Sequence, residues 1–242
     1  MKKVWIITRR ELRSYFDSLI AYLMIIIFLG LSGFFTWLSN GSNVFLLGQA
    51  DMQVFFSISF WTLFFFIPAI TMRSLAEENR SGTIEFLSTK AVTDWQIIQG
   101  KFLSCLLLVV IAIACTFPYY WSVASLGSVD HGAILGGYGG LILLSALYVS
   151  FGIFASSITQ NQIVAFLLAL VIGVMFHLLF GLLAMGQSGL AGNIFEYLSV
   201  RAHYDSIARG VIDTRDIVYF LSLIFLGLFL AKTALGKRNW QD

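Results

Sequence analysis

Six long apolar runs constrain the fold of this 242-residue chain more than any other feature of its sequence. A helix needs about 20 apolar residues to cross a hydrocarbon core of roughly 30 Å. Because a helix satisfies its own backbone hydrogen bonds, it is the expected form of such a run in lipid. The runs lie at residues 19–38, 54–74, 101–124, 134–156, 162–184 and 216–235. We therefore predict an all-α polytopic membrane protein with six transmembrane helices.

The composition supports this class and leaves little chain for anything else. Hydrophobic residues make up 58% of the sequence and charged residues 12%, whereas soluble domains carry about 25% charged residues. The runs and their links use the whole chain, so we expect a single transmembrane domain over residues 1–242. The net charge of +2 is too small to indicate a nucleic-acid partner, and we expect none.

The basic residues indicate the orientation of the chain. With six spans, the N-terminal segment, the link 72–102 and the C-terminal segment lie on one side of the membrane. These segments hold five, four and three of the 15 Lys and Arg residues. Lysine and arginine are enriched in the cytoplasmic loops of membrane proteins. We therefore expect a multi-pass protein with both termini in the cytoplasm.

Residues 2–19 predict an amphipathic helix before the first span. On a wheel of about 100° per residue, the basic residues share one face, and the other face carries Val4, Trp5, Leu12, Tyr15, Phe16 and Leu19. A basic helix with a tryptophan on its apolar side is typical of a helix that lies in the headgroup layer. We therefore expect an interfacial helix in contact with membrane lipid. The alternative is a solvated helix packed on protein.

The link 72–102 is the longest stretch that cannot dissolve in lipid, so we expect it to face water. Thr93 and Gln96 have the spacing of a capping box. They predict a helix that begins at Asp94 and continues through Gly100 and Lys101 into span three. Force applied to this helix would reach the membrane.

A second short helix is predicted upstream in the same link. Gly82 ends one helix, and Thr83–Leu87 form the next, with Glu85 in the first turn and Ile84 one turn before Leu87. A short helix that presents apolar residues is typical of docking into a groove of another protein. We interpret it as a cytoplasmic coupling helix between spans two and three. The alternative is a plain connecting loop.

The segment 186–215 mixes charged and apolar residues, which predicts short outer helices between spans five and six. Asp213 is expected to cap span six, with Asp216 in its first turn. An outer gate or partner surface, or else a structural cap, is the interpretation for His203, Tyr204, Asp205 and Arg209. In span four, Gly136 and Gly140 have the G-x-x-x-G spacing of close helix contacts, inside the chain or at a dimer seam.

Two stretches of the chain resemble a known family. Residues 77–102, EENRSGTIEFLSTKAVTDWQIIQGKF, are similar to the cytoplasmic loop of ABC-2 type permeases, the membrane subunits of ATP-binding-cassette exporters. A glutamate, then Gly-Thr-x-Glu-x-Leu, and a later Gly-Lys at the next span are typical of that loop. Residues 201–222 resemble the permease of the gliding-motility ABC transporter group. Ala91 departs from the pattern, because many relatives have a proline there.

The resemblance implies a permease subunit that couples ATP hydrolysis by a separate ATPase to substrate movement or force transmission across a bacterial inner membrane. It implies a second permease copy, in a homodimer or heterodimer, and an auxiliary periplasmic-facing membrane subunit. ATP and Mg would be bound by the ATPase, and this chain would bind no cofactor or metal. The contact with the ATPase would use Glu77, Gly82, Thr83, Ile84, Glu85 and Leu87, and coupling to span three would use Thr93, Gln96, Gly100 and Lys101.

The residues themselves argue that this chain is not the ATPase. The pair Gly100-Lys101 would need a glycine five positions before Gly100 and a Ser or Thr after Lys101 to form a phosphate-binding loop. Trp95 and Phe102 stand at those positions instead. We therefore expect no enzyme activity in this chain.

Two functions from other classes are alternatives. A stand-alone channel or secondary transporter needs ionisable groups along a midplane path, and of the three histidines only His177 lies well inside a span. An intramembrane metalloprotease is suggested faintly by Glu77-Glu78 followed by Arg80. It needs zinc ligands at short spacing, which the histidines lack.

Overall fold

A computed structural model describes residues 2–39, 51–82, 92–187, 189–211 and 213–238. Every regular element in these residues is a helix. The helices are α1 (Lys2–Asp17), α2 (Leu19–Trp37), α4 (Gln53–Thr71), α5 (Ala76–Ser81), α7 (Asp94–Ala114), α8 (Phe117–Leu126), α9 (His131–Ser157), α10 (Gln162–Val174), the π-helical η1 (Met175–Leu179), α11 (Phe180–Gly186), α12 (Leu190–Leu198), α13 (Val200–Ala208) and α14 (Thr214–Arg238).

Six stretches of helix in the described residues are long and apolar enough to cross a membrane. They are Leu19–Trp37, Gln53–Ser81, Asp94–Leu126, His131–Ser157, Gln162–Gly186 and Thr214–Gly236. Each overlaps one predicted apolar run, so the predicted all-α class and six spans are confirmed. The third stretch is interrupted between α7 and α8, where Pro118 stands in the first turn of α8 and has no N–H to continue the ladder.

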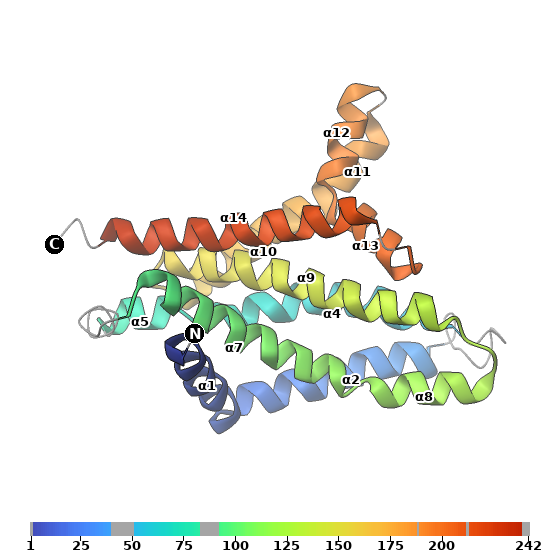
Figure 1. The fold of residues 1–242 in the computed structure, drawn as a ribbon, viewed down its shortest axis with the longest axis horizontal. Helices are drawn as coiled ribbons and strands as arrows, with labels where there is room; N and C mark the ends of the chain where they lie inside the picture. The colour runs from blue at the N-terminus through green and yellow to red at the C-terminus, as the bar shows by residue number, and fades with distance from the viewer. Residues whose placement is uncertain (1, 40–50, 83–91, 188, 212, 239–242) are drawn as a thin grey trace.

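The spans run back and forth, so that α1 and the last turns of α14 lie at one end of the bundle (Figure 1). We call this the terminal end; it also holds α5 and the start of α7. The opposite, far end holds α8, α13 and the start of α14. The first and last helices therefore lie at the same end, as six spans require. The assignment of that side to the cytoplasm stays a prediction.

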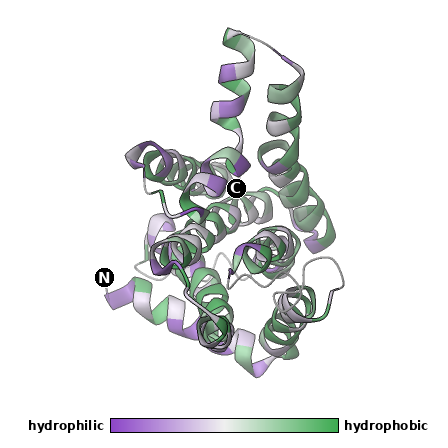
Figure 2. Cartoon of the chain, turned by 90° about the vertical axis from the view of Figure 1, so that its right-hand side faces the viewer, coloured by the Kyte–Doolittle hydropathy of each residue, from purple (hydrophilic) through white to green (hydrophobic). Residues whose placement is uncertain are grey.

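The outward faces of the bundle are apolar. Figure 2 shows hydrophobic residues on the outside of the spans as well as between them, and hydrophilic residues along α1. Large exposed side chains include Leu23 and Ile26 on α2, Leu167 and Val171 on α10, and Phe225 on α14. Such a surface is unsuited to water and fits a lipid environment.

Helix α9 is the centre of the bundle. It contacts α4, α7, α10, α13 and α14, and most of its side chains are buried. Near its start, a Cβ atom on Gly136 would lie 2.6 Å from the carbonyl oxygen of Ile207, and one on Gly140 would lie 3.2 Å from the Tyr204 ring. The G-x-x-x-G spacing therefore serves a contact with α13 inside this chain.

Helix α1 is present as predicted, but its expected apolar face is divided. Ile7, Thr8 and Tyr15 are buried against the rest of the chain, whereas 59% of Trp5 is exposed. The reason is Gly100 on α7: a Cβ atom there would lie 2.6 Å from the Ile7 side chain, so the glycine admits Ile7 and sets which arc of α1 packs on α7. The place of α1 in the headgroup layer stays a prediction.

The α9–α13 contact predicts that the same substitution affects stability differently at two nearby glycines of α9. Gly136→Ala should lower the free energy of unfolding by about 1–3 kcal/mol, because the new methyl group meets a backbone carbonyl. Gly139 has open space around its Cα, so Gly139→Ala should leave stability unchanged or raise it through helix propensity. Unfolding in mixed detergent micelles measures both. Equal effects of the two substitutions would contradict the assigned contact.

Candidate functional site: a charge cluster at the terminal end

The short helix α5 is held at its start by a serine from a distant span. The backbone N–H groups of Leu75 and Ala76 both donate to Ser156 Oγ, at 3.0 and 2.9 Å. The same hydroxyl donates to the carbonyl oxygen of Met72 at 3.0 Å. Because the first N–H groups of a helix have no partner within it, Ser156 at the end of α9 satisfies groups that α5 leaves open.

The end of α5 is also fixed. Asn79 is buried, and its Nδ2 donates to the carbonyl oxygens of Ser157 and Thr159, both at 3.4 Å, in the turn between α9 and α10. Gly82 follows with φ = 69°, a left-handed conformation that glycine adopts without steric cost and that ends many helices. The predicted helix break at Gly82 is therefore confirmed. Residues 83–91 follow this helix end in the sequence.

A cluster of four charged side chains joins α5 to α1 and α7. Lys101 is the central cation: 2% of its side chain is exposed, and its Nζ lies 2.9 Å from Glu78 Oε1 and 3.6 Å from Glu11 Oε2. Arg10 lies at the rim, with its Nη2 2.5 Å from Glu11 Oε1 and 3.6 Å from Glu78 Oε1. We call Arg10, Glu11, Glu78 and Lys101 the charge cluster.

The charge cluster is neutral as a whole, with two cations and two carboxylates. A buried ammonium group costs several kcal/mol unless it is paired and hydrogen-bonded. Both carboxylates, less than a fifth exposed, supply that pairing from two other helices. The hydrogen bond to Glu11 raises the pKa of Arg10 above its usual value, so this guanidinium stays charged. The three helix segments are therefore linked by interactions that are costly to separate.

Uncharged contacts extend the same connection along α1. Thr8 Oγ1 donates to the carbonyl oxygen of Gly100 at 3.2 Å. The Tyr15 hydroxyl lies 3.4 Å from the carbonyl oxygen of Ile70 on α4 and 3.3 Å from Cys105 Sγ on α7. Burial raises the pKa of Tyr15 well above its usual value, so the phenol stays neutral and keeps its hydrogen. Helix α1 thus contacts both spans that flank residues 83–91.

The predicted coupling residues of span three lie where expected. Thr93 accepts a hydrogen bond from the Gln96 N–H, and the Gln96 side chain accepts one from the Thr93 N–H, so the capping box is confirmed. The helix begins at Asp94 and continues through Gly100 and Lys101. Both of these residues contact α1.

The predicted ATPase-contact residues are only partly within the described chain. Glu77 is exposed and pairs with Arg73 at 3.0 Å, outside the charge cluster. Thr83, Ile84, Glu85 and Leu87 lie outside the described residues, so the coupling helix stays a prediction. The sequence interpretation missed Arg10, Glu11 and Glu78. The available signal was Lys101 itself, since a lysine at the entrance of an apolar span needs anionic partners.

The four residues singled out near the far end separate onto two sides of α13. His203 is buried against α14, with Nδ1 2.6 Å from Asp216 Oδ1 and Nε2 3.0 Å from the carbonyl oxygen of Tyr197. His203 thereby links α13 to the first turn of α14 and to the carbonyl of Tyr197 on α12. Tyr204, Asp205 and Arg209 line a pocket beside α4 instead. A gate or partner surface at these residues stays a prediction.

The cap of the last span follows the expectation. Asp213 Oδ1 accepts a hydrogen bond from the Arg215 N–H at 2.9 Å, and α14 begins at Thr214. Asp216 is buried in the first turn, where its carboxylate meets His203. The acidic first turn thus also anchors α13.

Six apolar helices, an apolar outer surface and a charge cluster at one end define a multi-pass membrane protein. In it, α5 after span two and the start of α7 are attached to each other and to neighbouring helices. The chain matches the family described as ABC-2 family transporter protein over residues 38–236. It belongs to that family. It is therefore a membrane permease of an ABC exporter, a class that is not itself catalytic and normally works with an ABC ATPase. A search of curated proteins found no match.

The match bears on the sequence interpretation in two ways. It covers the five later spans and the link 72–102, so the resemblance to ABC-2 permeases is confirmed. It begins at residue 38, so α1 and the two charge-cluster residues on it lie before the matched region. The gliding-motility group stays a prediction.

The charge cluster predicts a sharp difference between adjacent glutamates. Glu78→Gln should lower the free energy of unfolding by about 3 kcal/mol, because the only carboxylate left to Lys101 is then the more distant one of Glu11. Glu77→Gln removes an exposed pair and should cost no more than about 1 kcal/mol. Thermal unfolding in detergent compares the two variants. Similar losses would show that the cluster does not hold these helices together.

Proposed function

We propose that this chain couples ATP hydrolysis by a separate ATPase subunit to substrate movement, or to force transmission, across a bacterial inner membrane. It would act beside a second permease copy, with the terminal end in the cytoplasm. ATP and Mg would be bound by the ATPase. An auxiliary subunit on the periplasmic side would complete the assembly if the gliding-motility resemblance holds.

The observation that supports this proposal is the attachment on both sides of residues 83–91. The segment leaves α5 at Gly82 and enters α7 at Thr93. Both flanking helices meet in the charge cluster, through Glu78 and Lys101. A push on the segment would therefore be applied to α1, α5 and the start of α7 together.

Such a push would be transmitted as a rigid-body movement. Helix α7 continues for 21 residues into the membrane and contacts α9, α14 and α2. Closure of an ATPase dimer would tilt span three against span two between two discrete arrangements. The ATPase contributes the energy, and the charge cluster keeps the cytoplasmic ends of the helices moving as one unit.

A charge reversal in the predicted contact tests the partner. Glu85→Arg should abolish permease-stimulated ATP turnover while membrane insertion stays intact, because it places a cation in the first turn of the docking helix. The measurement is ATP turnover after expression of the chain with its genomic neighbours, with mass spectrometry of the proteins that co-purify. A chain that purifies alone, or unchanged turnover, would contradict the proposal.

A second substitution tests coupling apart from docking. Lys101→Met should leave an ATPase bound but reduce stimulated turnover by about tenfold or more, because Arg10 alone then compensates both glutamates and no ion pair among the described residues joins α5 to α7. Lys232→Met is the matched control, since Lys232 is an exposed lysine on the terminal half of α14. Co-purification and turnover are measured on the same preparations. Normal turnover in Lys101→Met would show that coupling does not need the charge cluster.

Cargo movement and force transmission differ in one further measurement. Vesicles that contain the complex would accumulate or lose cargo during ATP turnover if the chain moves a substrate. Stimulated turnover without vectorial movement would favour force transmission to a periplasmic partner.

A further inference from the structure

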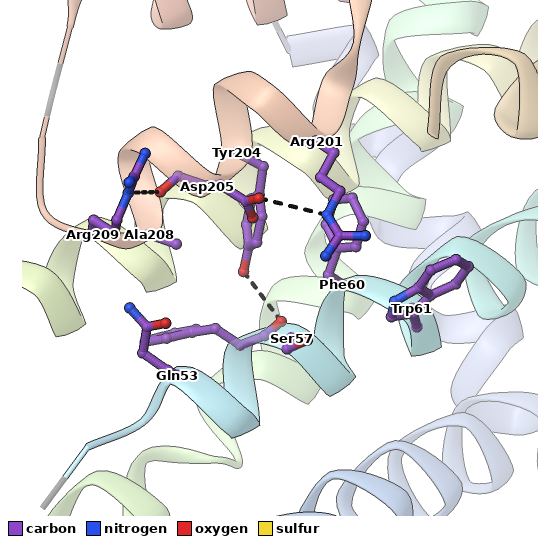
Figure 3. A pocket seen from close by; sticks show the side chains of 10 residues that line it. Gln53, Ser57, Phe60, Trp61, Arg201, Tyr204, Asp205, Ala208 and Arg209 are labelled. Atoms are coloured by element: carbon purple, nitrogen blue, oxygen red, sulfur yellow. Dashed lines mark hydrogen bonds and ion pairs between the residues drawn. The ribbon is translucent and has the colours of Figure 1, made fainter. Parts of the chain in front are cut away.

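A pocket of about 320 Å³ lies at the far end, between the first turns of α4 and one face of α13. Figure 3 shows Gln53 and Ser57 of α4 on one side and Arg201, Asp205 and Arg209 of α13 on the other. Helix α13, which lines it, lies at the opposite end of the bundle from α1 and α5, which carry three residues of the charge cluster (Figure 1). The proposed coupling to an ATPase makes no use of the pocket.

The rim of the pocket is charged and carries an excess of one positive charge. Arg201, Asp205 and Arg209 follow one another at four-residue spacing on α13, so they share a face of the helix. Arg201 Nε lies 3.5 Å from Asp205 Oδ2, and Arg209 Nε donates to the Asp205 carbonyl oxygen at 3.0 Å. Both arginines are exposed. Each therefore keeps its terminal amino groups for a ligand.

The floor of the pocket is aromatic. Phe60 is buried and stacks on Tyr204, with ring centroids 4.8 Å apart. The Tyr204 hydroxyl is occupied, because it donates to the carbonyl oxygen of Phe56 at 3.3 Å. Trp61 lies next to Phe60 and is partly exposed. The tyrosine thus adds apolar surface to the floor, and Phe60 and Trp61 continue that surface toward the middle of the span.

Along α4, the polar residues of the pocket come first and the aromatic residues follow. A span that enters a bilayer passes the headgroup layer and the acyl chains in the same order. The helix begins at Gln53, and Trp61 lies eight residues further, which is about 12 Å along the helix axis. The polar rim is therefore at the level where the span leaves the membrane, and the aromatic floor is at the level of the acyl chains. A ligand that fills the pocket needs an anionic head and an apolar body in the same order.

We propose that this pocket binds a phospholipid, whose phosphate group accepts hydrogen bonds from the terminal amino groups of Arg201 and Arg209 and whose acyl chains lie against Phe60 and Trp61. Guanidinium groups bind phosphate through two parallel hydrogen bonds, which makes arginine the preferred residue for this anion. A free phosphate ion would use the rim but leave the aromatic floor empty. A neutral lipid would use the floor and leave the terminal amino groups of both arginines without a phosphate partner.

Native mass spectrometry of the purified full chain in a neutral detergent distinguishes a phospholipid from a free phosphate ion and from a neutral lipid. Phosphatidylglycerol should bind at least about tenfold more tightly than a diacylglycerol with the same acyl chains, because only the first has a phosphate. Inorganic phosphate should not displace it at equal concentration. Equal binding of the diacylglycerol, or displacement by inorganic phosphate, would overturn the proposal. The chain is assayed without an ATPase, so the result is independent of the proposed coupling function.

Substitutions locate the binding at this pocket. The double variant Arg201→Gln, Arg209→Gln should weaken phosphatidylglycerol binding by about tenfold or more. Arg215→Gln is the matched control: Arg215 is an exposed arginine at the same end, outside the pocket, and its loss should change binding little. Equal weakening by the control would show that general surface charge attracts the lipid.

A second variant tests the cavity without touching its charges. Ser57 is exposed and lines the pocket on α4, so Ser57→Phe should fill the space and reduce binding while every arginine remains. Thermal unfolding of each variant confirms that the chain stays folded. Unchanged binding in a folded Ser57→Phe variant would exclude this pocket as the lipid site.

Discussion

A buried ammonium group needs carboxylate partners, and this requirement determines which helices meet at the terminal end of the protein. Lys101 stands at the entrance of span three with almost no exposed surface. Its partners come from an N-terminal helix and from the short helix that follows span two. Removing any one partner leaves charge without compensation in a poorly hydrated place. The three helix segments consequently form one unit, although Glu11, Glu78 and Lys101 are each more than 20 positions apart along the chain.

Two kinds of interaction, ion pairs and uncharged hydrogen bonds, hold α5 at the terminal end. The charge cluster fixes α5 from the side of α1 and α7, while Ser156 and Asn79 fix it from the side of α9 and α10 through uncharged hydrogen bonds. Helix α5 has only six residues, too few to be stable alone. Its structure therefore depends on these tertiary contacts. This dependence makes α5 responsive to whatever acts on the adjoining link.

Span two connects the two ends of the molecule. Helix α4 begins beside the arginine-rimmed pocket and, 19 residues later, leads into the turn that carries α5. Along the way it packs on the central helix α9 and on α2. The glycines of α9 allow such close packing, because spans gain little from apolar burial in lipid and rely on contact between backbones. One rigid span thus adjoins both a site for lipid and the site proposed for coupling.

The sequence by itself determined the class, the six spans, the capping box at Thr93, the helix end at Gly82 and the cap at Asp213, because each depends on residues close in the chain. Apolar length fixes a span, and capping depends on neighbours three residues apart. Only the tertiary structure decided that Lys101 meets Glu11 and Glu78, that His203 meets Asp216, and that Tyr204 stacks on Phe60. Those pairings depend on which faces of distant helices meet. That choice follows from the fit of residues such as Gly100 and Ile7, which no periodicity in the sequence encodes.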